Sequence, residues 1–481
     1  MSEAATRADR TPLARPELLA SLAPLLRTWL PRQRWFAGKG HPVHGFTLVS
    51  ATELLPPGSA PRLLHLLVRA EQTSPTGPTA DCYQLLVGVR PALPPRLAPA
   101  LIGRPETGPL RGAAVYEALY DPRLAELLLE ALRMRARVGA LRFERTPRAE
   151  IPSALVPRVL GVEQSNSSLV YGDALILKLF RRVLPGTHPD LELPLALAAE
   201  GCGRVPPPVA WFLADPDEGG AAPQQDGALV LGVLQPFLPE ARDGWGTALG
   251  SLARGEDFTA EASALGRATA EVHGALARAL PPVTLGRPQI EALARGMAER
   301  LDDTARAVPA LRPYARGLRT SFDALARLGA DGERTWTAQR VHGDLHLGQC
   351  LRGPDGEWSL IDFEGEPARP LTERRLPQPA VRDVAGMLRS FDYAARQHRP
   401  WSPDWSDACR AAYCAGYARV SGRDPRQEPV LLRAYETDKA VYEVLYEARH
   451  RPDWLPVPLA AVQRLARPAG ALLHEIRAPE P

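Results

Sequence analysis

Hydrophobic and polar positions follow one period in the first half of the chain and another in the second. Before Pro239, apolar residues form short runs with the length and composition of strands. The clearest runs are 62–68, 83–89, 174–180 and 228–238. Beyond Pro239, apolar residues recur at helical spacing. Helices are expected there at 258–280, 290–308, 311–328, 381–397, 404–420 and 430–449. The pattern predicts an α+β fold in which a small β-rich lobe precedes a large helical lobe.

Local signals divide the first half further. Helices are expected at 16–29, 113–135 and 191–200. The prolines between Pro91 and Pro99 are too dense for a regular element and predict a connector. Gly172-Asp173 between two β-rich runs predicts a hairpin. The expected domains are a cap over residues 1–95, an intermediate and nucleotide-binding region over 96–236, and a helical lobe with the catalytic and sugar-binding site over 237–481.

One polar stretch in the helical half has the pattern of a phosphoryl-transfer site. It reads VHGDLHLGQ from Val341 to Gln349, and Asp362 follows thirteen residues after that glutamine. In kinases, a loop aspartate takes the proton of the acceptor hydroxyl, an amide oxygen holds one magnesium ion, and a second aspartate bridges magnesium to the nucleotide. Asp344, Gln349 and Asp362 stand in that order. The sequence therefore predicts an ATP-dependent kinase with Asp344 as its catalytic residue.

The predicted magnesium site contains a further acid. Asp362 and Glu364 are two residues apart at the end of an expected strand, so both carboxylates should point to one face. Paired acids are favourable when a cation lies between them, and oxygen donors suit Mg²⁺. A solvated strand end without metal is the alternative. We expect Gln349, Asp362 and Glu364 to bind Mg²⁺, and Asp383 to hold the catalytic loop.

Lysine is rare in this chain, which makes each lysine informative. Of 58 basic residues only Lys39, Lys178 and Lys439 are lysines. Lys178 lies near the end of an expected strand, where kinases place the lysine that binds the α- and β-phosphates. Glu192, at the start of the next helix, is its expected partner. The alternatives are a surface lysine and an acid that is favoured by the helix dipole.

The sequence lacks both the G-x-G-x-x-G loop and the P-loop motif. Gln164 to Ser168 stands at the expected position of the phosphate loop. Small hydroxyl and amide residues with exposed N–H groups can also surround phosphate oxygens, although a polar turn without a ligand is the alternative. We expect the nucleotide to contact Ser165, Asn166 and Ser167, and also Gln235 and Phe237 around the hinge proline.

Composition restricts the class of protein. A hydrophobic content of 45% in 481 residues supports more than one core. The net charge of +3 gives no basis for a nucleic-acid partner. The five cysteines lack metal-site spacing, and no run has the length of a membrane span. We expect a soluble, cytoplasmic protein with reduced thiols and no membrane partner.

The catalytic block and several other segments resemble bacterial maltokinases of the actinobacterial type. The similar segments are 34–40, 342–349, 362–367, 382–394, 439–443 and 451–456, whereas 376–380 and Pro236 depart from the family pattern. The resemblance implies a bilobal fold like that of eukaryotic protein kinases, in the aminoglycoside-phosphotransferase-like branch, with an extra N-terminal cap domain. It implies transfer of phosphate from ATP to the anomeric hydroxyl of maltose, giving maltose 1-phosphate for α-glucan and glycogen synthesis. An enzyme that interconverts trehalose and maltose is then a candidate partner.

The expected acceptor site involves the helix predicted at 430–449. Lys439, Tyr442, Glu443 and Tyr446 are three or four residues apart, so they lie along one side of that helix. A half-buried helix with an internal Lys439–Glu443 ion pair is the alternative. The resemblance favours contacts of these side chains with the sugar. Trp454 is then expected to stack on a sugar face and His346 to contact the sugar, although His346 packed on its own loop is the alternative.

Two other functions fit the same motifs. The first is another small-molecule kinase of this branch, acting on an aminoglycoside, choline or a different sugar. An aminoglycoside kinase would need an acidic acceptor pocket, whereas Lys439, Arg389 and Arg449 belong to the acceptor region of this sequence. The second is a catalytically silent kinase-fold protein that binds nucleotide, and the complete set of motif residues argues against it.

Overall fold

The computed structural model describes residues 15–467, except for 57, 75–76, 162–164, 216–226, 331–334 and 368. The chain forms two units: unit 1 contains Met1–Leu191 and Pro207–Pro239, and unit 2 contains Glu192–Pro206 and Glu240–Pro481. Gln164 and most of the predicted polar loop at 215–227 lie outside the described residues. The sequence-based boundaries between cap, nucleotide-binding region and helical lobe stay predictions.

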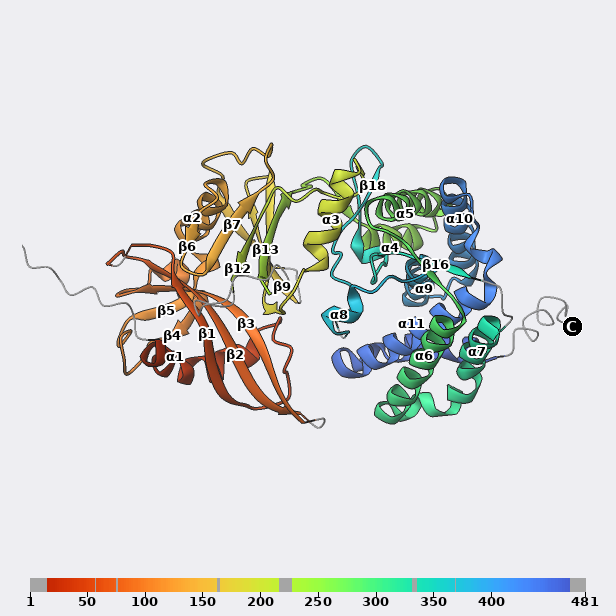
Figure 1. Cartoon of the computed structure of the whole chain (residues 1–481), viewed down its shortest axis with the longest axis horizontal. Helices are drawn as coiled ribbons and strands as arrows, with labels where there is room; N and C mark the ends of the chain where they lie inside the picture. The colour runs from red at the N-terminus through yellow and green to blue at the C-terminus, as the bar shows by residue number, and fades with distance from the viewer. Residues whose placement is uncertain are drawn as a thin grey trace, which may run out of the picture. The chain divides into compact units, whose positions relative to one another are not determined.

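Unit 1 begins with a six-stranded antiparallel sheet (Figure 1). Its strands are β1 (Val43–Glu53), β2 (Arg62–Ser74), β3 (Gly77–Arg90), β4 (Leu101–Gly103), β5 (Ala114–Glu117) and β11 (Arg182–Val183). On β2, Leu64, Leu66 and Val68 pack with α1 (Arg15–Trp29) in one core. Leu63 and Leu67 face a second core on the other side. The two cores explain why 62–68 reads as a nearly continuous apolar run.

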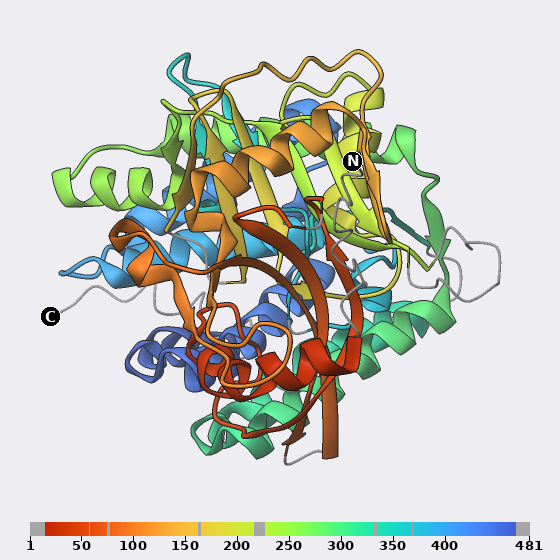
Figure 2. The same cartoon turned by 90° about the vertical axis from the view of Figure 1, so that its left-hand side faces the viewer.

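The second core lies under a seven-stranded antiparallel sheet of order β6-β7-β12-β13-β10-β9-β8. Its strands are β6 (Arg137–Val138), β7 (Leu141–Arg145), β8 (Pro157–Leu160), β9 (Asn166–Tyr171), β10 (Leu175–Phe180), β12 (Ala210–Ala214) and β13 (Leu229–Pro236). Figure 2 shows α2 (Pro122–Arg133) running across this sheet. The predicted hairpin is confirmed, because β9 and β10 pair with Tyr171 opposite Leu175.

Two predictions in this unit were wrong. The predicted helix at 113–135 starts as strand β5, continues as a 3₁₀ turn at Ala118–Tyr120, and becomes helical only at Pro122. Asp121 caps that helix by accepting from the Arg123 N–H, and proline at the first helical position fits this start. The proline-dense connector contains a 3₁₀ helix at Pro95–Ala100.

Unit 2 is mainly helical, and its predicted helices are confirmed within a few residues. Its long helices are α4 (Gly244–Arg254), α5 (Thr259–Ala279), α6 (Arg287–Ala307), α7 (Arg312–Ala330), α9 (Val381–Gln397), α10 (Pro403–Ser421), α11 (Pro429–His450) and α12 (Pro456–Leu465). Helix α3 (Pro189–Ala199) begins in unit 1 and continues in unit 2. Helices α5 and α10 lie close together (Figure 1). Gly266 permits this approach because it has no side chain: a Cβ atom there would lie 2.1 Å from the Tyr413 carbonyl oxygen.

Short strands and a short helix frame the catalytic block. They are β14 (Arg242–Asp243), β15 (Val283–Leu285), β16 (Trp336–Ala338), β17 (Cys350–Arg352), β18 (Trp358–Leu360) and α8 (Leu371–Arg374). Residues 339–349 connect β16 to β17, and β17 pairs with β18. Among the described residues, no helix combines the length and apolar character needed to cross a lipid bilayer.

Candidate active site

Asp383 holds the catalytic loop through backbone hydrogen bonds, as predicted. Its Oδ2 accepts from the His342 N–H at 2.7 Å and its Oδ1 from the Gly343 N–H at 2.8 Å. Gly343 has φ +84°, a conformation that favours glycine and turns the loop sharply. Gly386 of α9 allows close approach, since a Cβ there would lie 2.6 Å from the Leu345 carbonyl oxygen. The loop that carries Asp344 is therefore tied to the first turns of α9.

His273 of α5 completes the support of Asp383. Its Nε2 lies 2.9 Å from Asp383 Oδ2 and its Nδ1 lies 3.0 Å from the Tyr417 hydroxyl. An Nε2–H tautomer donates to Asp383 while Tyr417 donates to Nδ1, so every polar atom has a partner. Burial alone would raise the pKa of Asp383, but the His273 hydrogen bond and the loop amides lower it below its ordinary value. The buried carboxylate of Asp383 in α9 therefore connects the catalytic loop to His273 in α5 and, through His273, to Tyr417 in α10.

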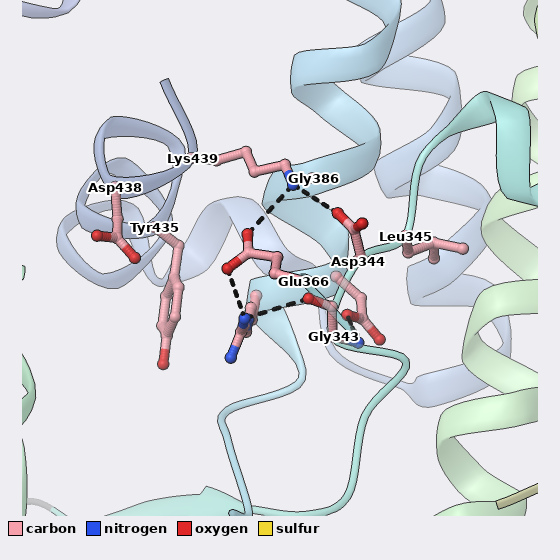
Figure 3. Close-up of a pocket in the computed structure, with 10 residues that line it drawn as sticks. Gly343, Asp344, Leu345, Glu366, Gly386, Tyr435, Asp438 and Lys439 are labelled. Atoms are coloured by element: carbon pink, nitrogen blue, oxygen red, sulfur yellow. Dashed lines mark hydrogen bonds and ion pairs between the residues drawn. The ribbon is translucent and has the colours of Figure 1, made fainter. Parts of the chain in front are cut away.

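The carboxylate of Asp344 meets the ammonium group of Lys439 (Figure 3). The distance from Lys439 Nζ to Asp344 Oδ1 is 2.6 Å, and the same nitrogen lies 3.2 Å from Glu366 Oε1. Lys439 belongs to α11, so the tertiary fold brings the predicted acceptor helix to the predicted catalytic residue. Asp344, Glu366 and Lys439 line one pocket with Gly343, Leu345, Arg382, Asp383, Gly386, Tyr435 and Asp438.

Glu366 is the centre of the charged cluster beside this pocket. Its side chain is 5% exposed, and its Oε2 accepts from Arg369 Nε at 2.5 Å and from Arg382 Nη2 at 3.1 Å. Arg382 Nη2 also donates to the Gly343 carbonyl oxygen at 3.1 Å. Burial opposes ionisation, but Lys439, Arg382 and Arg369 together hold the pKa of Glu366 far below its ordinary value. Glu366 therefore links the catalytic loop to α9 and α11.

Of the predicted magnesium ligands, Asp362 and Glu364 follow β18, and Gln349 precedes β17. Gln349 Nε2 donates to Asp362 Oδ2 at 2.8 Å, and carboxylate oxygens of Asp362 and Glu364 lie within 4.8 Å of each other. The expected strand-end geometry was wrong: β18 ends at Leu360, and Asp362 has φ +68°, which is unusual for a residue with a side chain. An amide and carboxylates form an oxygen donor set that fits a hard divalent cation.

The expected Lys178–Glu192 pair is not the pairing that the structure contains. Lys178 Nζ lies 2.8 Å from Asp190 Oδ2. Glu192 instead pairs with Arg340 at 2.7 Å and with Arg375 at 3.7 Å. Helix α3 begins at Pro189, and residues two apart on a helix do not face the same way. Asp190 and Glu192 therefore point to different partners.

The predicted nucleotide residues divide between the two faces of the seven-stranded sheet. Ser168 lies opposite Lys178, Asn166 opposite Phe180, and Gln235 opposite Ile176. Because side chains alternate along strands, Asn166 and Gln235 share the face of Lys178. Ser167 lies on the other face, where its hydroxyl accepts from Arg181 Nε at 2.8 Å.

Two further predicted nucleotide residues flank this region. Asn166 Nδ2 donates to the Ser165 hydroxyl at 3.3 Å. The Phe237 N–H donates to the Ala174 carbonyl oxygen at 2.8 Å, which places Phe237 directly after β13. Nucleotide contact by Ser165, Asn166, Ser167, Gln235 and Phe237 stays a prediction.

Helix α11 carries four of the predicted acceptor residues, and Lys439, Tyr442 and Tyr446 form a row on it. Lys439 Nζ lies 4.6 Å from the centre of the Tyr442 ring, and the Tyr442 and Tyr446 rings are 6.2 Å apart. Glu443 Oε2 accepts from Arg389 Nη2 at 2.5 Å, so the alternative Lys439–Glu443 pair was wrong. Trp454 stacks on Tyr393 with ring centres 6.1 Å apart. Among the predicted acceptor residues Lys439, Tyr442, Glu443, Tyr446 and Trp454, only Lys439 lines the pocket that contains Asp344.

His346 is engaged with its own loop. Its Nδ1 accepts from the Gly348 N–H at 3.1 Å, and burial lowers its pKa. These contacts match the alternative of a histidine packed on the backbone, and contact with a sugar stays a prediction.

Sequence reasoning missed three residues that organise these sites: Asp190, His273 and Glu366. Asp190 follows a proline at the start of α3, which is a favourable position for an acid. Glu366 precedes Arg369 by three residues in the same motif. His273 gave no local signal, since it lies within α5 and its partner is 110 residues away.

Comparison with known proteins identifies a cap domain and a phosphotransferase domain in this chain. Residues 29–121 match the model of the maltokinase N-terminal cap domain, and residues 155–429 match the phosphotransferase enzyme family. Glucosamine kinase of Streptacidiphilus jiangxiensis is 32% identical over 328 residues, covering 62% of this chain and 70% of that protein. Glucosamine kinase of Mycolicibacterium smegmatis is 31% identical over 332 residues, covering 64% of this chain and 79% of that protein.

A solved glucosamine kinase structure, described as crystal form B, has the same fold. It superposes with a TM-score of 0.63 at 24% identity, covering 92% of this chain and 98% of that one. Another, in complex with glucosamine, ADP and inorganic phosphate, gives a TM-score of 0.60 at 24% identity over the same shares of the two chains. The predicted kinase-like fold with an N-terminal cap domain is confirmed. The chain belongs to the phosphotransferase enzyme family of aminoglycoside-phosphotransferase-like kinases and carries a cap domain of the maltokinase type.

Proposed function

We propose that this kinase transfers the γ-phosphoryl group of ATP to the anomeric hydroxyl of maltose, giving maltose 1-phosphate and ADP. The observation that carries the proposal is the placement of Asp344 on a loop fixed by Asp383, beside Lys439 of the acceptor helix. Asp344 Oδ1 binds Lys439, and Asp344 Oδ2 has no protein hydrogen bond within the described part of the chain. That oxygen is available to accept a hydrogen bond from a sugar hydroxyl.

The proposed reaction is an in-line displacement at phosphorus. The C1 oxygen of maltose forms a bond to the γ-phosphorus as the bond between that phosphorus and the β,γ-bridging oxygen of ATP breaks. The hydroxyl proton passes to Asp344, and ADP leaves with the bridging oxygen. Gln349, Asp362 and Glu364 would hold Mg²⁺, which supplies charge neutralisation for the triphosphate. Lys178, held by Asp190, binds the inner phosphates on this proposal.

The acceptor side of the proposal is supported by the cap-domain match and by side-chain chemistry. Tyr442, Tyr446 and Trp454 offer aromatic faces and hydrogen-bonding groups, which suit the mixed polar and apolar surface of a sugar. Glu443 is already paired with Arg389 and so offers hydrogen-bond acceptors without an unpaired charge. This surface fits an uncharged carbohydrate.

Glucosamine is the second candidate acceptor, because two relatives are named glucosamine kinases. The amino group of glucosamine is cationic near neutral pH, so it requires an acid that is not already neutralised. Asp344 and Glu443 are each paired with a cation. The pairing of these two acids therefore favours maltose over glucosamine.

The test is ADP release from ATP and magnesium with maltose, glucosamine, glucose, trehalose and kanamycin in parallel, with Asp344→Asn as the blank. We expect turnover with maltose that the substitution abolishes. Phosphorylation at C1 removes the reducing end, so a reducing-sugar assay distinguishes the 1-phosphate from other isomers. Turnover with glucosamine instead would replace the acceptor and keep the kinase. No turnover with any acceptor despite ATP binding would favour the silent, nucleotide-binding alternative.

A further inference from the structure

The ammonium group of Lys439 lies directly against the carboxylate of Asp344. Figure 3 shows Lys439 reaching from α11 between two carboxylates. Its nitrogen lies 2.6 Å from Asp344 Oδ1 and 3.2 Å from Glu366 Oε1, and its side chain is 14% exposed. The ring of Tyr442 borders the same nitrogen at 4.6 Å. Any acceptor hydroxyl that reaches Asp344 is therefore close to a fixed positive charge.

Lys439 is held by Glu366 as well as by Asp344. Glu366 is itself bound by Arg369 and Arg382, which fix its carboxylate and so fix the second partner of Lys439. Burial alone would lower the pKa of Lys439, but the carboxylates of Asp344 and Glu366 outweigh burial and raise it above its ordinary value. The side chain is therefore an ammonium throughout the neutral pH range.

The other acids that line the pocket are also matched. Asp438 binds Arg300 at 2.9 Å and Arg369 at 3.2 Å. Asp383 is satisfied by loop amides and by His273. In the described part of the pocket lining, each carboxylate thus has a cationic or hydrogen-bonding partner. An ammonium group entering the pocket would find no unpaired carboxylate to bind and would be repelled by the ammonium group of Lys439.

We propose that Lys439 is the specificity-determining residue that restricts this kinase to uncharged sugar acceptors. The inference rests on the proposed function, because it takes Asp344 as the residue that receives the acceptor hydroxyl. A hydroxyl can donate to Asp344 Oδ2 and accept from Lys439, whereas an ammonium beside Asp344 is repelled by a like charge. Specificity then comes from a repulsive element as much as from an attractive one.

The experiment compares kcat/KM for maltose, glucose, N-acetylglucosamine and glucosamine in the wild type and in Lys439→Met. Methionine keeps much of the volume of lysine and removes the charge. We expect the ratio of glucosamine to glucose to rise by at least about tenfold in Lys439→Met. N-acetylglucosamine, which is uncharged, should not gain in this way. Lys439→Arg keeps a charge and should keep the wild-type ratio. Lys39→Met removes an exposed lysine of unit 1 and should also keep it.

Thermal unfolding first establishes that Lys439→Met is folded. If it is not, the wild type decides: raising the pH until the glucosamine ammonium loses its proton should raise the kcat/KM for glucosamine relative to glucose. An unchanged ratio in folded Lys439→Met, or no pH effect where that variant does not fold, would overturn the inference. Wild type that prefers glucosamine at neutral pH would also overturn it.

The outcomes separate this inference from the proposed function. Turnover of another uncharged sugar but not of maltose, with the charge selectivity intact, would refute only the proposed function. Turnover of maltose with the same selectivity in Lys439→Met would refute only the role of Lys439.

Discussion

Replacing Asp383 by asparagine tests whether the buried carboxylate holds the catalytic loop. In the wild type, Asp383 accepts the N–H groups of His342 and Gly343 and the Nε2–H of His273, with both oxygens in use. Asparagine keeps the shape but replaces one oxygen by an NH₂ donor. Whichever way the amide turns, one loop N–H then faces a donor and is left without an acceptor.

The size of the effect follows from these contacts. A hydrogen bond to a charged group contributes about 1.5–3 kcal/mol, and leaving a buried donor unsatisfied costs about 1–3 kcal/mol. Because the two numbers partly describe the same loss, we expect a local destabilisation of about 3 kcal/mol. That corresponds to an increase of about 100-fold in the equilibrium constant for opening the loop.

Native-state hydrogen exchange read by mass spectrometry measures this opening directly. The peptide that contains His342 and Gly343 should exchange about 100-fold faster in Asp383→Asn, and kcat should fall because Asp344 loses its fixed position. Asp407→Asn makes the same chemical change at an exposed site of α10 and should leave that peptide unchanged. Equal exchange of the peptide in Asp383→Asn and the wild type would refute the reasoning.

Two further predictions concern the buried side chain of His65 and the partner of Lys178. His65 is fully buried with an unpaired Nδ1, and burial lowers its pKa from 6.5 to about 4 despite the Gln84 hydrogen bond. Its unfolded form therefore binds more protons between these values, and unit 1 should lose up to about 3 kcal/mol of stability as the pH falls from 6.5 to 4, measured by urea unfolding. His65→Gln should remove that slope, and an equal slope in both proteins would contradict the assignment. Asp190→Asn should weaken ATP binding in calorimetry by about tenfold, and Glu192→Gln by less, because Asp190 is the 2.8 Å partner of Lys178. A larger effect of Glu192→Gln than of Asp190→Asn would instead support the pairing of Lys178 with Glu192 that the sequence predicted.

Periodic elements were predictable from the sequence because their signal is local. Helix α9 was predicted with its exact bounds, since its apolar residues face one core at regular helical spacing. The helix predicted at 113–135 failed because its first residues are apolar and buried on every side within strand β5, which erases any period. The Asp-Pro start at 121–122 marked the true beginning.

The chemistry-bearing side chains were also predictable, but their partners were not. Asp344, Gln349 and Asp362 stand within one motif, and the structure places Gln349 against Asp362. The partner of Lys178 depends on where α3 begins, and a start two residues earlier exchanges one acid for another. Glu366 binds Lys439, which is 73 residues away in the sequence, so only the tertiary fold creates this contact.

The scarcity of lysine gains a physical meaning from these contacts. Arginine replaces lysine almost everywhere in this chain, yet Lys178 and Lys439 are nearly buried in ion pairs with acids, whereas Lys39 is exposed. Lys439 serves two carboxylates that approach one nitrogen from different residues, and a compact ammonium with three donors suits that geometry. A planar guanidinium is larger and presents its donors in one fixed fork. Lys439→Arg should therefore keep the charge-based selectivity while lowering kcat, because the fork cannot hold Asp344 and Glu366 in their present positions.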